Sequence, residues 1–167
     1  MKALLIIAPE RFRDEEYFDT KEELEKARVG TVTASKHGGE SKGMLGGKAT
    51  GIPLNKVDVC AYDAVVFIGG GGSAVYFKDQ QALKIARDAY EAGKVVAALC
   101  IAPTILANAG ILQGKRVTCF HGEDSSLRAA GAQYTGEGVT VDGNIITADG
   151  PKTAKDFGKA IAKALGK

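Results

Sequence analysis

Cys100 stands where the sequence changes from a buried apolar run to a helical segment. The run 95–99 predicts a strand buried on both faces, and residues 101–109 predict a helix with Pro103 in its first turn. Small residues flank the cysteine in Ala98-Leu99-Cys100-Ile101-Ala102. This is the pattern of a nucleophile elbow, because a sharp strand-to-helix reversal leaves no room for bulk. We therefore expect the Cys100 thiol to project at the carboxyl end of a sheet.

The surroundings of Cys100 favour an ionised thiol. The start of the following helix offers unpaired N–H groups and the positive end of a dipole. The Ile101 N–H lies where an oxyanion would form, and a loop of glycines, Gly69, Gly70 and Gly71, is expected to supply a second donor. The prediction is a reactive thiolate. The alternative is that Cys100 is a small buried hydrophobic residue, as free cysteines often are.

The other cysteines and a second glycine motif indicate no further site. We interpret Cys60 and Cys119 as packing residues, because no helix follows either strand, and a redox role of Cys119 beside His121 is the alternative. The spacing Gly69-x-Gly71-x-x-Ala74 matches a dinucleotide fingerprint. That fingerprint belongs to the first strand-to-helix turn, which has no glycine here, so we reject it. We expect neither a cofactor nor a metal.

Alternating strands and helices must position this thiol. Apolar or Val/Thr-rich runs predict strands, and helical spacing or capping signals predict helices. The expected strands are residues 2–8, 29–35, 63–68, 95–99 and 116–120, with two more flanking the turn Asp142-Gly143. The expected helices are residues 20–28, 82–90, 101–109, 124–130 and a last one from Pro151, and residues 36–51 form turns or a small hairpin. This order predicts a single α/β domain, residues 1–167, with a mostly parallel sheet covered by helices on both faces.

Composition and charge exclude several classes of protein. The 167 residues are 45% hydrophobic and 25% charged, which is typical of a soluble globular chain. The net charge is +2 without a basic stripe, so we expect no nucleic-acid partner. No apolar run is long enough to cross a bilayer, so we expect no membrane. Three cysteines make no disulfide framework, and free thiols indicate a reducing compartment, the cytoplasm.

The chain resembles the PfpI/DJ-one superfamily over essentially its whole length. The resemblance is carried by the segments Phe12–Glu16, Asp63–Gly70, Ala97–Thr104 and Val141–Pro151. It implies a flavodoxin-like three-layer sandwich, a homodimer and Cys100 as the nucleophile. It also implies a glutamate beside that cysteine, which the Phe-x-Asp-x-Glu pattern assigns to Glu16. We interpret Asp14 and Glu15 as solvated carboxylates at the start of a helix.

Two positions depart from the pattern of this superfamily. Members credited with peptidase activity carry histidine directly after the cysteine, where this chain has Ile101. Other members place a histidine on the strand matched by residues 116–120, where Phe120 stands here and His121 follows. His121 either reaches the site from its loop or is an exposed loop residue. His37 is interpreted as a surface residue.

Three functions are compatible with these residues. In the first, Cys100 adds to the aldehyde of a small dicarbonyl such as methylglyoxal, or to its adduct on an amine or thiol, and Glu16 shuttles protons. Such an enzyme would be a cofactor-independent glyoxalase or deglycase. In the second, oxidation of Cys100 makes the chain a redox-sensing or chaperone-like stress protein. The third is an intracellular cysteine peptidase or amidase, and a non-catalytic dimeric binding module is the remaining alternative.

Overall fold

The elements alternate along the chain much as the sequence predicts. The computed structural model describes residues 1–167. The strands are β1 Lys2–Ile6, β2 Glu10–Phe12, β3 Gly30–Ser35, β4 His37–Gly43, β5 Lys48–Pro53, β6 Ala64–Phe67, β7 Val95–Leu99, β8 Arg116–Val117, β9 Gln133–Tyr134, β10 Val139–Asp142 and β11 Ile145–Ala148. The helices are α1 Asp14–Lys26, α2 Gln80–Glu91, α3 Pro103–Asn108, α4 Ser125–Ala129 and α5 Ala154–Ala164. Short 3-10 turns include Gly71–Tyr76 and Pro151–Thr153.

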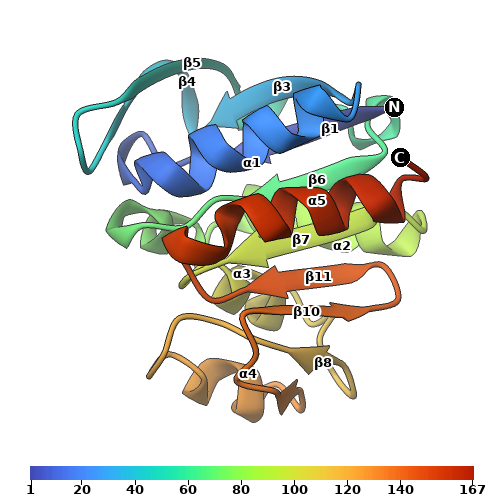
Figure 1. Cartoon of the computed structure of the whole chain (residues 1–167). Coiled ribbons are helices and arrows are strands. Elements are labelled where there is room, and N and C mark those ends of the chain that lie inside the picture. Colours follow the sequence, from blue (N-terminus) through green and yellow to red (C-terminus); the bar gives the residue numbers. More distant parts are fainter.

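One mixed sheet of nine strands organises the molecule, in the order β10-β11-β7-β6-β1-β3-β5-β4-β2 (Figure 1). Its central strands are parallel, because β1 pairs with β3 and β6, and β7 pairs with β6 and β11. The antiparallel pairs are the β10–β11 and β4–β5 hairpins. Phe67 is in register with Ala98, so the chain leaves β6 and β7 at the same edge of the sheet. This register places the glycine loop beside Cys100.

Two hydrophobic cores lie on opposite faces of the sheet. Alternate residues of β1 divide between them: Leu4 and Ile6 pack with α2 and α3, whereas Ala3 and Leu5 pack with α1 and α5. Side chains of successive strand residues point to opposite faces, so a continuous apolar run is buried on both sides. Each such side chain contributes roughly 1.5–3 kcal/mol on full burial. The predicted layered architecture is therefore present.

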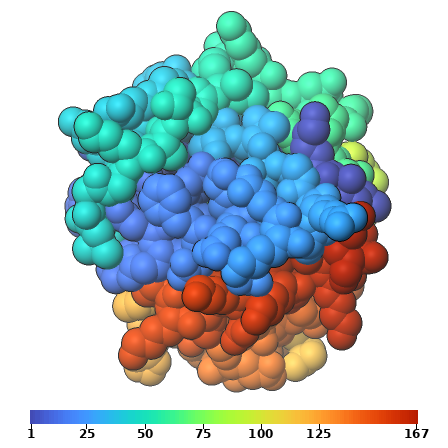
Figure 2. All heavy atoms as spheres, turned by 45° about the horizontal axis from the view of Figure 1, so that its top comes forward, coloured from blue at the N-terminus to red at the C-terminus, as the bar shows by residue number.

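Helices α1 and α5 pack closely on one face, where Figure 2 shows them side by side. Gly158 allows this approach, since a Cβ built there would lie 2.9 Å from Glu23 Cβ and 3.1 Å from the Thr20 carbonyl oxygen. The expectation that Thr20 starts the first helix is wrong, because α1 begins at Asp14 and Thr20 is buried inside it. Three acidic residues in the first turn favour the earlier start, since they lie at the positive end of the helix dipole.

Other boundaries also differ from the predictions. The strand predicted over residues 116–120 ends at Val117 and pairs with β9 outside the main sheet. The predicted helix 101–109 begins only at Pro103. The last hairpin turns at Gly143-Asn144, one position later than predicted, because Asp142 pairs with Ile145. The residues 36–51 form part of the β4–β5 hairpin, in agreement with one of the two interpretations.

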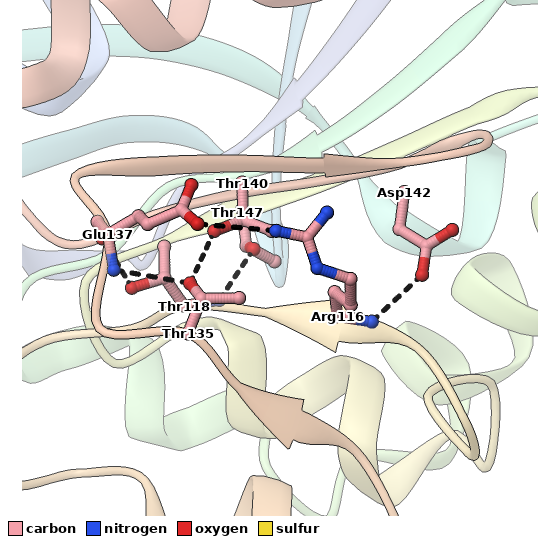
Figure 3. A network of polar contacts seen from close by, with 7 residues as sticks. All are labelled: Arg116, Thr118, Thr135, Glu137, Thr140, Asp142 and Thr147. Carbon is pink, nitrogen blue, oxygen red and sulfur yellow. Dashed lines mark hydrogen bonds and ion pairs between the residues drawn. The ribbon is translucent and has the colours of Figure 1, made fainter.

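A threonine-rich network attaches β8 to the β10–β11 hairpin (Figure 3). The Thr118 N–H donates to Thr147 Oγ1 at 2.9 Å, and the Thr118 hydroxyl donates to the Glu137 carbonyl at 2.6 Å. The hydroxyls of Thr135 and Thr140 lie 2.6 Å apart. Thr118, Thr140 and Thr147 are buried, so these hydrogen bonds satisfy polar groups that water does not reach. The network fixes the start of the segment that continues to Phe120.

Both ends of the chain lie at the amino edge of the sheet, opposite Cys100. Met1 and Gly166 line one hollow together with Asp63, Lys94 and Asn144, which precede β6, β7 and β11. Figure 1 shows the two termini on the same side of the molecule. No helix combines the length and the apolarity that crossing a bilayer requires.

Candidate active site

Cys100 occupies a strained turn directly after β7. Its φ is +63°, a left-handed conformation that side-chain-bearing residues rarely adopt and that costs on the order of 1–3 kcal/mol. Two backbone hydrogen bonds hold the turn: the Cys100 N–H donates to the Ala148 carbonyl at 3.0 Å, and the Cys100 carbonyl accepts from the Phe120 N–H at 2.8 Å. The predicted elbow geometry is therefore present.

Glu16 reaches the same place from the first turn of α1. Its side chain is fully buried, and neither carboxyl oxygen has a hydrogen-bond partner of ordinary length and angle. A Cβ built on Gly69 would lie 2.5 Å from both Cys100 Cβ and Glu16 Oε1. Only glycine leaves room for the two side chains to meet over this position. The Arg13 N–H donates to the Gly69 carbonyl at 3.0 Å, which fixes the start of α1 against the loop.

The Glu16 carboxyl and the Cys100 thiol titrate as a buried pair. Burial raises the pKa of Glu16 to about 8, although the Cys100 thiol and the Gly69 N–H act to lower it. Burial and then the charge of Glu16 raise the pKa of Cys100 to about 12, against the N–H groups of Gly70 and Ile101, which lower it. Two negative charges repel strongly when they are buried close together, so the pair carries at most one charge near neutral pH.

The helix start does not act alone on the Cys100 thiol, because burial and the charge of Glu16 oppose it. The donors named from the sequence, Gly70 and Ile101, do lower the pKa of the thiol, but burial outweighs them. In addition, α3 begins at Pro103, whose nitrogen carries no hydrogen, so it offers one free donor fewer than a helix that starts without proline. The thiol also has the Glu16 carboxyl beside it, and the two groups can exchange a proton.

A small cavity of about 230 Å³ opens over this pair. Of the binding residues named from the sequence, Gly70, Gly71, Ile101 and Phe120 line it and Gly69 does not, and Phe120 is 45% exposed. Sequence reasoning missed four further lining residues: Arg13, Met44, Glu123 and Pro151. Arg13 lies inside the segment Phe12–Glu16, and Pro151 ends the segment Val141–Pro151, so the family resemblance could have indicated both. No local signal distinguishes Met44, because its position depends on a hairpin distant in sequence.

The structure does not bring His121 into this cavity. His121 is exposed and lines an adjoining hollow with Lys152, on the other side of Phe120 and Pro151. No histidine lines the Cys100 cavity. Cys119 is buried, as expected of a packing residue, but the same interpretation of Cys60 is wrong, because its thiol is exposed. Cys60 lines a larger hollow of about 690 Å³ between residues 54–60 and α2, with no buried carboxyl group beside it. No group of three or more histidine, cysteine or acidic side chains converges to hold a metal ion.

Asp14 is buried, contrary to the expectation of a solvated carboxylate. It is 8% exposed, and its oxygens accept the N–H groups of Leu45 and Gly47. The expectation was correct for Glu15 in part, since its side chain is 36% exposed and pairs with Arg13 at 2.9 Å. The side chains of Asp14 and Glu16 thus both leave the first turn of α1 toward the interior, and each meets a different partner.

Comparisons with known proteins agree with this architecture. A family model described as the DJ-1/PfpI family matches residues 1–164. An uncharacterized protein of Methanocaldococcus jannaschii is 39% identical over 170 residues, covering 99% of this chain and 83% of that protein. A protein of Pyrococcus horikoshii named a deglycase is 32% identical over 174 residues, covering 99% of both chains. The solved structure of a ThiJ/PfpI domain protein from Brachyspira murdochii aligns with a TM-score of 0.96 and 36% identity, over 99% of this chain and 96% of that one. The predicted flavodoxin-like fold is confirmed.

Proposed function

This chain belongs to the DJ-1/PfpI family, and we propose that it is a cysteine-dependent enzyme acting on small dicarbonyls such as methylglyoxal and on their amine or thiol adducts. The observation that carries the proposal is the buried Glu16 carboxyl beside Cys100 at the floor of a small cavity. The name of the Pyrococcus horikoshii relative, a deglycase, supports the same class of substrate.

The first step forms a covalent adduct at the aldehyde. Glu16, as the carboxylate, accepts the thiol proton while the sulfur of Cys100 bonds to the aldehyde carbon. The carbonyl π electrons move to oxygen, which takes the proton back from Glu16, and the product is a thiohemiacetal. We expect the N–H groups of Gly70 and Ile101, which already act on the sulfur, to stabilise the oxygen as its charge develops. For an amine adduct, the C–N bond breaks as the C–S bond forms, and the amine leaves with the thiol proton.

The second step is an internal redox exchange that needs no cofactor. Glu16 removes the hydrogen of the former aldehyde carbon as a proton, and the electron pair forms an enediolate with the neighbouring carbonyl, whose oxygen then takes the hydroxyl proton of the first carbon. Return of the proton to that neighbouring carbon oxidises the first carbon by two electrons, reduces the second by two, and leaves a thioester on Cys100. Water then attacks the thioester, the C–S bond breaks, and a 2-hydroxy acid departs. The overall reaction is methylglyoxal plus water to lactate.

Formation of lactate from methylglyoxal tests the proposal. Cys100→Ser is expected to reduce the rate to background, and Glu16→Gln to reduce it by at least about 100-fold, because it removes the acid/base group. Cys60→Ser is the matched control, since it removes an exposed thiol far from the cavity and is expected to leave the rate unchanged. Equal rates for the wild type and Cys100→Ser would contradict the proposal.

Oxidation of the same sulfur is the second candidate function. The unpartnered Glu16 carboxyl, protonated below pH 8, has a hydrogen to donate to a sulfinate on Cys100. Mass spectrometry after mild peroxide treatment is expected to find two added oxygens on Cys100 and fewer in Glu16→Gln. Oxidation of Cys60 alone would count against a sensing role.

Peptidase activity is not proposed, because no histidine lines the cavity.

A further inference from the structure

Asp14 connects the first turn of α1 to the tip of the β4–β5 hairpin. One carboxylate oxygen accepts the Leu45 N–H at 2.9 Å, and the other accepts the Gly47 N–H at 2.7 Å. The carboxylate is 8% exposed. Hydrogen bonds to a charged acceptor are the stronger kind, so a single side chain holds both ends of this tip.

The hairpin tip leaves room for that carboxylate. A Cβ built on Gly47 would lie 2.5 Å from Asp14 Oδ2 and 2.8 Å from Phe18 Cε2, and a Cβ on Gly43 would overlap the same carboxylate. Neither glycine has a left-handed φ, whereas Gly46 at the apex has φ +91° and open space around it. Close approach, rather than backbone conformation, therefore requires glycine at positions 43 and 47.

The residue held between these glycines faces the proposed active site. Met44 lines the cavity over Cys100, and its N–H donates to the Phe12 carbonyl at 2.8 Å. The Gly43 N–H closes the tip on the Gly47 carbonyl at 2.7 Å. Met44 is itself 40% exposed, so few other contacts restrain its side chain. Its place as a wall of the cavity depends on the backbone that Asp14 binds.

We propose that Asp14 is a positioning residue that fixes Met44 over Cys100 and thereby limits the size of molecule that reaches the thiol. The inference concerns the site of the proposed function, but it is a statement about access and does not require turnover. Loss of the Asp14 carboxylate releases the tip, and the cavity opens to larger molecules.

Alkylation of Cys100 by a small and a bulky reagent tests this inference. The rates with iodoacetamide and with a fluorescein maleimide are measured by intact mass in a Cys60→Ser background, which removes the exposed thiol. Asp14→Ala is expected to raise the ratio of the maleimide rate to the iodoacetamide rate by about tenfold. This is the change in an equilibrium that corresponds to the loss of a hydrogen bond to a charged group. Asp14→Asn keeps one acceptor oxygen and is expected to give an intermediate ratio.

Two further variants separate positioning from general loosening. Gly47→Ala keeps Asp14 but displaces the tip, so it is expected to raise the ratio as well, and it serves as the test if Asp14→Ala does not fold. Asp63→Ala removes a carboxylate that accepts the Lys2 N–H at 2.8 Å at the opposite edge, and should leave the ratio unchanged. A folded Asp14→Ala or Gly47→Ala with the wild-type ratio overturns the inference.

Turnover adds a second, independent readout. If the wild type forms lactate, Asp14→Ala is expected to raise KM for methylglyoxal while kcat stays nearly constant, because Glu16 and Cys100 are untouched. If the wild type forms none, the proposed function fails and the alkylation ratio still decides the role of Asp14.

Discussion

Glu16 is a carboxyl group whose protonation depends on the fold. It is fully buried, without a cation in contact, and beside a second acidic group in Cys100. Burial favours the neutral acid, so the native state holds a proton that the unfolded chain releases. The same property that makes Glu16 a suitable acid/base group near neutral pH therefore makes it destabilising in alkaline solution.

Replacing Glu16 by glutamine should remove the contribution of this position to the pH dependence of stability. The folded pKa of about 8 lies above the ordinary value of 4.5, so the native state binds more protons between these values and wild-type stability falls as pH rises through that window. The advantage of Glu16→Gln over the wild type in free energy of unfolding should grow from pH 4 to pH 9 by up to roughly 5 kcal/mol. Urea denaturation at several pH values measures it.

Glu15→Gln is the control for that experiment. Its carboxylate is half-exposed and its hydrogen bonds with Arg13 hold its pKa below the ordinary value, so its contribution is complete well below neutral pH. The difference between Glu15→Gln and wild type should be constant from pH 6.5 to pH 9. A constant difference for Glu16→Gln over the whole range would contradict the burial of that carboxyl.

Individual residues show what sequence reasoning reached and where it stopped. Cys100 and Glu16 were found because their segments carry recognisable patterns, and Gly70 because parallel strands leave a sheet at one edge. The burial that raises the pKa of the thiol was outside the reach of sequence reasoning, because burial is a property of the packed molecule and not of neighbouring residues. Asp14 was misread for the same reason: its partners, Leu45 and Gly47, come from a distant hairpin.

At the scale of elements, the central strands were predicted well and their connections less so. Runs buried on both faces, such as β1, β6 and β7, need no distant information to be recognised. The start of α1 was missed, because a capping pattern at Thr20 competes with the acidic first turn and the tertiary contacts favour the earlier start. The strand predicted over residues 116–120 was too long and its partner β9 was not predicted, since their pairing depends on the threonine network around Thr118.

The contact between α1 and α5 provides a prediction at this scale. Gly158→Val places a branched side chain where even a Cβ is 2.9 Å from Glu23 Cβ, so we expect the free energy of unfolding to fall by about 1–3 kcal/mol. Lys159→Val puts the same side chain at an exposed position of the same helix and should cost only a few tenths of a kcal/mol. Urea denaturation of both variants measures the difference, and equal losses would contradict the close packing at Gly158.

The whole molecule gathers its candidate site from segments that are far apart in the sequence. The residues of this site come from different elements and meet only because the sheet has the order β7-β6-β1 at its centre. They include Glu16, Gly70, Cys100 and Phe120. The fold class could be predicted from alternation of elements alone. The strand order and the contact of the β4–β5 hairpin with α1 could not, because both are set by pairings between residues far apart in the chain.

Met1 and Gly166 line the same hollow, so a short linker can join the two ends of the chain. A circular permutant that joins Lys167 to Met1 through a short glycine-rich linker, and opens the exposed turn between Gly143 and Asn144, keeps every residue of the Cys100 cavity. Surface turns tolerate such new termini. We expect the permutant to fold and to alkylate at Cys100 at the native rate, as judged by circular dichroism and intact mass.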